Sequence, residues 1–390
     1  MKNKEYIIFL LVFVLASGMT GCTEEPTRFE NGNLPYIENR NEISTAVAFY
    51  DTSLVFWEPL NAGISLSLLM GEFENQNTKI LIQFTNLPDD NQIISAKIRL
   101  TPKHLYGIAA GELYGEVREV EFFWNEDLIY IDSLSYSESP VSTFTVNPSE
   151  YMADEINIPV SVVEKWIEAQ NDTTFKNYGV LLEVPDGTYA KQYYAREDPS
   201  GESGRPYLVL EYADPDTTLE FLPTNDTYII DIEESYNYNF YTSNLGENLI
   251  VVFDLTHIPS TATVNYAELH MVLDEERTVW GIEDYYGLNI AMVKTAFGYT
   301  DPDILELSDI GRIESRISSD STNISFSTYQ NADFSRIVQA WVSNPYANYG
   351  LILYTSDQLV DYSRFSFVKD DPVLEKRCRL IVKYTTFKNK

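Results

Sequence analysis

Carboxylates and aromatic rings are the side chains of this sequence with the most chemistry to offer, because histidine and cysteine are scarce. The 390 residues include three histidines and two cysteines, and no HExxH, GxSxG or glycine-rich phosphate-binding motif is present. Paired carboxylates such as Glu126 and Asp127 are the residue types of a glycosidase. Neighbouring acids are expected by chance, however, in a chain with 59 of them. The sequence therefore predicts no catalytic residues and no enzymatic activity.

Aromatic rings give a stronger functional signal, because the flat face of a sugar stacks on Trp and Tyr. Trp280 precedes Gly281 and an acidic, aromatic stretch that is typical of a loop, and loops often carry binding residues. The alternative for every such ring is a packing role, which we prefer for Trp166 and Trp341 on apolar helix faces. The candidates for glycan stacking are Trp57, Tyr106, Trp124, Tyr193, Tyr194, Arg196, Trp280, Tyr285, Tyr286 and Tyr362.

The charge balance is strongly acidic, with 27 basic against 59 acidic residues and a formal net charge of −32. Such a chain repels phosphate backbones, which argues against nucleic acid as a partner. It also offers the carboxylate oxygens that Ca²⁺ prefers. Candidate loops for a structural calcium ion are Asp214-Pro215-Asp216, Asp301-Pro302-Asp303 and Asp370-Asp371. The alternative is that these are solvated turn carboxylates, and no other cofactor is predicted.

The chain repeats one order of landmarks in its two halves. Each half has a strand with Phe at or near its end, a proline-containing turn and a second strand. A helix with an apolar face, an Asn-Tyr-Gly tripeptide and a strand ending in Tyr follow. The helices carry Trp166 and Trp341, and the tripeptides end at Gly179 and Gly350. This order predicts that the tryptophans are equivalent and buried, and that each glycine opens a core strand.

The many short strands, with one short helix in each half, predict an all-β protein. We expect two tandem β-sandwich domains of jelly-roll type, residues 44–213 and 214–390, each with one short helix. The 28 tyrosines favour strand formation. Cys378 lies in an apolar strand pattern, so we expect a buried thiol without a disulfide partner.

The first residues have the pattern of a lipoprotein signal peptide. Two lysines precede the apolar run 7–16, which is shorter than the roughly 20 residues of a membrane-spanning helix. Met19-Thr20-Gly21-Cys22 resembles the lipobox of bacterial lipoproteins, in which the cysteine is lipidated. We therefore expect a signal peptide over 1–21, lipid on Cys22 and a polar tether over 22–43. The alternative is an ordinary cleaved signal with a chance cysteine.

The residues after the cysteine bear on localisation. Thr23 follows Cys22, and by resemblance to the sorting rules of Gram-negative bacteria a residue other than Asp favours the outer membrane. Glu24 and Glu25 resemble surface-export signals of some lipoproteins. The expected location is therefore the cell outer membrane, lipid-anchored and facing the cell surface.

The landmarks of the first half together resemble the DNRLRE-type domain of secreted bacterial and archaeal proteins, a relative of disaggregatase-related repeats. The resemblance covers about residues 44–213 and is carried by Ser95–Leu100, Trp166, Gly179, Ala195-Arg196-Glu197 and Pro206–Tyr212. The second half is more diverged, since Cys378 stands in place of Pro206. Such domains resemble carbohydrate-binding modules and occur beside polysaccharide lyases and hydrolases or in surface adhesins.

Two functions of different classes follow from these observations. The first is a non-catalytic surface lipoprotein that binds polysaccharide through its β-sandwich modules. The second is a structural or adhesive surface protein whose domains contact protein partners. The divergence of the second half supports this second function. Both place the protein on a membrane through the lipid on Cys22.

Overall fold

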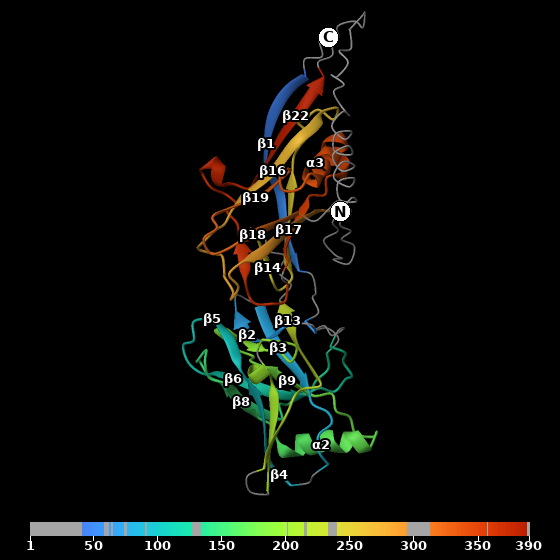
Figure 1. Ribbon diagram of the computed structural model, residues 1–390, viewed down its shortest axis with the longest axis vertical. Coiled ribbons are helices and arrows are strands. Elements are labelled where there is room, and N and C mark those ends of the chain that lie inside the picture. The colour runs from blue at the N-terminus through green and yellow to red at the C-terminus, as the bar shows by residue number, and fades with distance from the viewer. Residues whose placement is uncertain are drawn as a thin grey trace, which may run out of the picture. The chain divides into compact units, whose positions relative to one another are not determined.

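The computed structural model describes residues 41–57, 62–63, 65–73, 76–89, 92–126, 134–200, 202–213, 217–232, 240–294, 313–356 and 358–387. The predicted signal peptide, Cys22 and the predicted tether up to residue 40 lie outside the described residues. The described chain is all-β, as predicted, with antiparallel sheets and two α-helices (Figure 1). Residues Ile43–Thr386 form one compact unit.

The elements of the first half, residues 62–213, belong to two sheets and one helix. They are β2 (Ser67–Phe73), β3 (Gln76–Gln83), β4 (Ile93–Leu100), β5 (Pro102–Gly107), β6 (Leu113–Glu119), β7 (Ser142–Val146), β8 (Asp154–Asn157), α2 (Val160–Asn171), β9 (Val180–Glu183), β10 (Tyr189–Tyr194) and β11 (Tyr207–Tyr212). One sheet has the order β5-β10-β2-β3-β9-β6-β7, and the other contains β11-β4-β8.

The second half, residues 240–387, carries its strands and helix in a corresponding order along the chain. Its elements are β14 (Tyr241–Ser243), β15 (Glu247–Phe253), β16 (Thr263–Val272), β17 (Tyr286–Met292), β18 (Ile313–Ile317), β19 (Asn323–Ser327), α3 (Asp333–Ser343), β20 (Leu351–Thr355), β21 (Arg364–Ser366) and β22 (Arg379–Phe387). Three more strands complete the set of described strands: β1 (Asn41–Trp57), β12 (Thr218–Phe221) and β13 (Asn225–Ile232).

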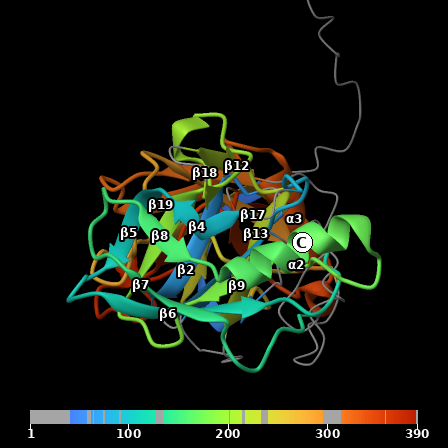
Figure 2. The ribbon, with the colours of Figure 1, turned by 90° about the horizontal axis from the view of Figure 1, so that it is seen from below.

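The two helices form because their apolar residues recur at helical spacing. In α2 the buried residues are Val162, Val163, Trp166 and Ile167, which share one face. In α3 the corresponding face carries Trp341, and both tryptophans are almost fully buried, as predicted. Figure 2 shows α2 lying across one end of the first-half strands, whose core receives its apolar face.

The Asn-Tyr-Gly tripeptides make the same turn in both halves. Asn177 Nδ2 donates to the carbonyl of Phe84 at 2.7 Å, and Asn348 Nδ2 donates to that of Phe253 at 2.7 Å. Gly179 and Gly350 have φ angles of +77° and +97°, a region that side chains other than glycine rarely adopt. Gly179 precedes β9, which pairs with β3, and Gly350 precedes β20, which pairs with β15. The predicted equivalence of the two glycines is therefore confirmed.

The halves exchange one strand each. β1 precedes the first half but lies between β15 and β22 in the second-half sheet, where Val55 is opposite Leu249. β13 precedes the second half but pairs along β3 in the first-half sheet, where Tyr228 is opposite Ile80. The β12 strand, just before β13, pairs with β11. The predicted division into 44–213 and 214–390 stays a prediction, but hydrogen bonding crosses it in both directions.

The exchanged strands contribute to the cores that they join. Ala46, Ala48 and Val55 of β1 belong to the hydrophobic core of the second half. Tyr228 and Ile230 of β13 belong to that of the first half. Because these apolar side chains are buried, each half depends on a strand from beyond its own continuous segment. The free thiol of Cys378 is buried in the second-half core, as predicted, and burial raises its pKa.

A short segment of the second half, residues 358–363, inserts into the first half; we refer to it as the plug. The carbonyl of Leu359 accepts hydrogen bonds from Ser65 Oγ at 2.7 Å and from Tyr228 at 3.1 Å. The Tyr362 hydroxyl donates to the carbonyl of Gly71 at 3.2 Å. It also shares a hydrogen bond with the Thr78 hydroxyl. Buried polar groups are thus satisfied across the two halves, which favours one fixed arrangement of the plug.

Candidate functional site

Several of the predicted stacking residues are buried, which corrects their interpretation. A sugar cannot stack on a ring that solvent does not reach, and these rings instead pack in the cores. They are Tyr106, Trp124, Tyr193, Tyr286 and Tyr362. Of the remaining predicted residues, Trp57 has a side chain outside the described part of the structure.

The buried rings use their polar atoms internally, as large amphipathic side chains do. The Tyr193 hydroxyl donates to Asp154 Oδ2 at 2.9 Å, and the same oxygen accepts Lys191 Nζ at 2.7 Å. Burial raises the pKa of Tyr193 well above its ordinary value. Trp124 Nε1 donates to the carbonyl of Tyr178 at 2.7 Å. These aromatic residues therefore stabilise the fold.

Tyr194 and Arg196 are half-buried and already engaged by protein groups. Lys103 Nζ lies 4.9 Å from the centre of the Tyr194 ring, a cation–π distance. The Arg196 guanidinium pairs with Glu126 and Glu197. Burial opposes the charge of Arg196, but these carboxylates raise its pKa. A glycan would have to compete with these partners.

The loop between Val279 and Tyr286 presents the predicted aromatic residues best; we call it the aromatic loop. The residue Tyr285 is 64% exposed. Trp280 is half-buried, with its ring centre 5.4 Å from that of Phe365 and 6.2 Å from that of Tyr286. Trp280 therefore rests on the core while part of it stays exposed. Among the predicted candidates, this pair offers accessible ring surface.

Hydrogen bonds hold the aromatic loop at both ends. Val279 and Arg364 exchange backbone hydrogen bonds of 2.7 and 2.9 Å. The Tyr286 hydroxyl donates to Asp361 Oδ2 at 2.7 Å and accepts the backbone N–H of Glu283 at 3.1 Å. Burial and the nearby Asp361 carboxylate raise the pKa of Tyr286, so its hydroxyl stays protonated. A loop fixed in this way loses little conformational entropy when a ligand binds.

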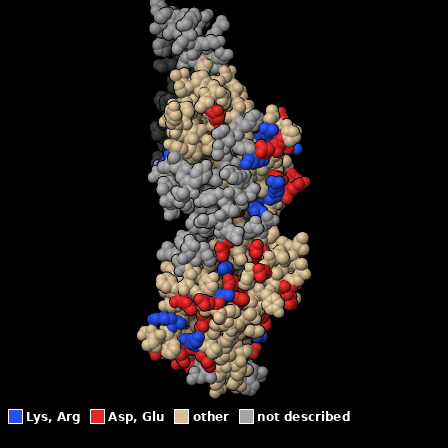
Figure 3. Space-filling view, turned by 180° about the vertical axis from the view of Figure 1, so that it is seen from behind, with Lys and Arg blue, Asp and Glu red and all other residues tan. Residues whose placement is uncertain are grey.

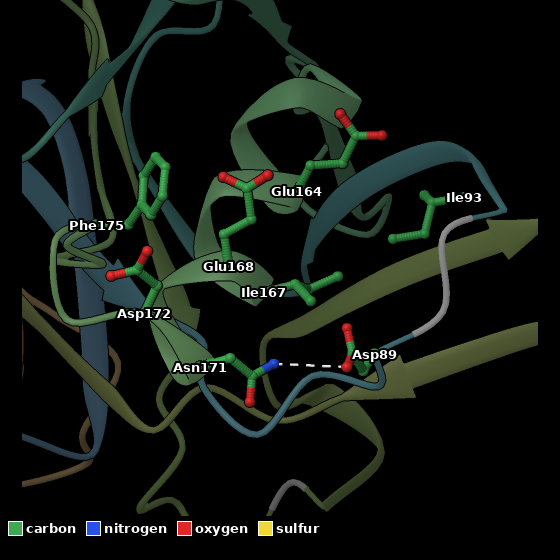
Figure 4. A pocket seen from close by; sticks show the side chains of 8 residues that line it. All are labelled: Asp89, Ile93, Glu164, Ile167, Glu168, Asn171, Asp172 and Phe175. Atoms are coloured by element: carbon green, nitrogen blue, oxygen red, sulfur yellow. Dashed lines mark hydrogen bonds between the residues drawn. The ribbon is translucent and has the colours of Figure 1, made fainter.

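A shallow cleft beside α2, with a volume of about 470 Å³, was not foreseen from the sequence (Figure 4). Asn171 Nδ2 lies 3.5 Å from Asp89 Oδ2 at its edge. The lining is acidic with apolar patches, and no predicted stacking residue contributes to it. It consists of Asp89, Ile93, Glu164, Ile167, Glu168, Asn171, Asp172 and Phe175. Its lining comes from α2, from the segments after α2 and β3, and from the start of β4, so no sequence motif marks it.

The predicted calcium loops contribute no cluster of ligands in the described residues. Asp214–Asp216 and Asp301–Asp303 lie outside them, and Asp371 Oδ1 accepts the backbone N–H of Val373 at 2.7 Å. A group of three carboxylates occurs elsewhere, at Glu126, Glu197 and Asp226. The sequence hides this group, because its members come from three distant segments. Acidic side chains gather over the lower half of the face in Figure 3, with Lys and Arg between them.

Comparison of the chain with protein-family models and with curated proteins found no match. The DNRLRE-type resemblance thus stays a prediction from its motifs. Within the described residues, no helix has the length and apolar character needed to cross a bilayer.

Proposed function

We propose that this protein is a non-catalytic lipoprotein of the outer-membrane surface that captures polysaccharide through two β-sandwich modules of jelly-roll type. The observation that supports it most is the aromatic loop, which carries both the exposed Tyr285 and the half-buried Trp280. The lipobox-like residues around Cys22 and the resemblance to DNRLRE-type domains support the location and the module type.

The chemistry of the aromatic loop suits a neutral sugar chain. Tyr285 offers a ring face to the C–H groups of a sugar, and the exposed Glu283 and Asp284 can accept hydrogen bonds from hydroxyls. The net charge of −32 opposes the approach of polyanions. We therefore expect neutral polysaccharides to bind more tightly than uronic-acid or sulfated polymers.

Affinity electrophoresis against plant, algal and bacterial glycans tests this proposal. At least one neutral polysaccharide should retard the protein, and Tyr285→Ala and Trp280→Ala should each weaken the retardation about fivefold, equivalent to about 1 kcal/mol. Tyr346→Ala is the matched control, because that tyrosine is 93% exposed on another surface segment. Phe175→Ala examines the cleft beside α2 in the same assay.

The outcome separates the two classes of function. If Phe175→Ala reduces the retardation and Tyr285→Ala leaves it unchanged, the glycan binds in the cleft beside α2 and not at the aromatic loop. No retardation by any glycan would reject polysaccharide capture. Recovery of a specific outer-membrane protein by the immobilised chain would then support the adhesive alternative.

A further inference from the structure

Three carboxylates from distant segments converge in the first half. Glu126 lies in the segment after β6, Glu197 follows β10, and Asp226 belongs to the exchanged strand β13. Each offers one oxygen, and these oxygens all lie within 4.8 Å of one another. Ca²⁺ binds its oxygen ligands at about 2.4 Å, so two ligands on opposite sides of one ion lie about 4.8 Å apart.

Asp226 gives the strongest evidence for a bound cation in this carboxylate cluster, because it is buried and one of its oxygens has no hydrogen-bond partner among the described residues. Its residue exposure is only 2%. Its Oδ2 accepts the backbone N–H of Arg196 at 2.9 Å, whereas Oδ1 has no hydrogen-bond partner among the described residues. The buried Oε2 of Glu197 likewise has none. Unsatisfied carboxylate oxygens are costly to bury unless a cation or a proton compensates them.

Arg196 compensates only part of the negative charge. Its guanidinium lies 3.2 Å from Glu126 Oε2, and its Nε donates to Glu197 Oε1 at 2.6 Å. Glu126 Oε1 also accepts the backbone N–H of Asp226 at 3.0 Å. One guanidinium against three carboxylates leaves two formal negative charges. Among the described residues, neither Asp226 Oδ1 nor Glu197 Oε2 accepts a hydrogen bond from Arg196.

We propose that Glu126, Glu197 and Asp226 bind one divalent cation, preferably Ca²⁺, and that this ion ties the exchanged strand β13 to the first half. Hard carboxylate oxygens and the spacing of the ligand atoms favour Ca²⁺ over the smaller Mg²⁺. Glu197 and Arg196 are partly exposed, so an ion can enter from solvent. This site is independent of glycan binding at the aromatic loop.

In the described part of the second half, the positions that correspond to Asp226 and Glu197 carry no carboxylate. Asp226 is opposite Ile82 on β3, and the corresponding position opposite Val251 on β15 is Ser53. Ala195 and Phe367 occupy corresponding positions, because the backbone N–H of each donates a corresponding hydrogen bond. Glu197 lies two residues after Ala195, and Lys369 lies two residues after Phe367. A serine and a lysine replace two of the acids, so the proposal predicts one ion at this type of site in each chain.

Isothermal titration with CaCl₂ and thermal unfolding in 5 mM CaCl₂ or EDTA, at pH 8.5, test the site. The wild-type chain should bind about one Ca²⁺ with a Kd of about 10⁻⁵–10⁻³ M and melt about 2–6 °C higher in Ca²⁺. Asp226→Asn should abolish both effects. Glu155→Gln should retain both, because that exposed acid pairs with Lys97 away from the cluster. Mg²⁺ at the same concentration should stabilise less.

Glu197→Gln is the second variant, because its side chain is partly exposed and its loss should not prevent folding. It should weaken Ca²⁺ binding at least about tenfold. No saturable heat and equal melting temperatures in Ca²⁺ and EDTA would overturn the proposal. Wild-type affinity in both Asp226→Asn and Glu197→Gln would also overturn it, because the ion would then lie elsewhere. A glycan assay without retardation would leave this result unaffected.

Discussion

At the scale of single residues, Tyr286 connects the aromatic loop to a buried carboxylate. Tyr286→Phe removes the hydroxyl that donates to Asp361 Oδ2 and accepts from Glu283 N. Because Asp361 is fully buried, the loss should lower the free energy of unfolding by about 1–3 kcal/mol. Urea unfolding checks the stability, and glycan retardation should weaken although Tyr285 is intact. Unchanged stability would show that the hydrogen bond does not hold the loop.

Asp226 should make stability depend on pH when no cation is bound. Burial, the largest cause, and the facing Glu197 and Glu126 raise its pKa to about 8, despite the opposing Arg196. The unfolded value is about 4, so the folded chain keeps a proton that the unfolded chain loses. Its contribution to stability is therefore complete below pH 4 and falls as pH rises towards 8. Urea unfolding in EDTA at pH 5 to 8.5 should show this fall.

Asp226→Asn provides the control for that pH dependence. An amide cannot titrate, so the variant should lose the part of the fall that the wild type shows in EDTA. Calcium should flatten the wild-type profile by replacing the proton. A variant with the same profile as the wild type would assign the fall to other groups.

At the scale of elements, the helix tryptophans should be the costliest single truncations. Trp166 stacks near Phe84 with ring centres 6.1 Å apart, and Trp341 is buried in the second-half core. Trp166→Ala and Trp341→Ala should each lower the free energy of unfolding by about 3–5 kcal/mol, measured by urea unfolding. Tyr346→Ala should change it by less than about 0.5 kcal/mol. Small effects in both tryptophan variants would contradict a core role for the helices.

Sequence reasoning succeeded where the signal was local. The spacing around Trp166 and Trp341 predicted buried helix faces, and the tripeptides ending at Gly179 and Gly350 predicted equivalent turns, because each pattern depends on neighbouring residues. It did not predict which neighbouring tyrosine is exposed: Tyr285 is, and Tyr286 is not. A strand alternates its faces, but only the tertiary fold determines which face is covered.

Strand partners were beyond the reach of sequence patterns for the same reason. β1 and β13 occupy equivalent positions along β15 and β3, so either strand suits either sheet by pattern alone. The carboxylate cluster depends on that choice, because Asp226 reaches Glu126 and Glu197 only when β13 joins the first half. Sequence patterns therefore predicted neither the exchange of β1 and β13 nor the carboxylate cluster that depends on it.

At the scale of the whole molecule, the exchange sets which fragments can fold. A fragment of residues 62–232 keeps β12 and β13 paired with the first-half sheets, whereas a fragment of residues 44–213 lacks both and contains β1 without its second-half partners. We expect 62–232 to unfold more cooperatively and with greater protection of β3 amides in hydrogen exchange, because β3 keeps its partner along one edge. Equal behaviour of the two fragments would show that β13 contributes little to the first half.

The position of β1 also determines how the chain would carry mechanical load. If Cys22 is lipidated, as we propose, tension from the membrane enters the described chain at β1. That strand lies between β15 and β22 of the second half, and its ladder with β15 runs from Tyr50 to Trp57. Tension along the strand would shear these hydrogen bonds together. A glycan pulling on the aromatic loop would therefore load the second half directly, with the first half outside the main force path.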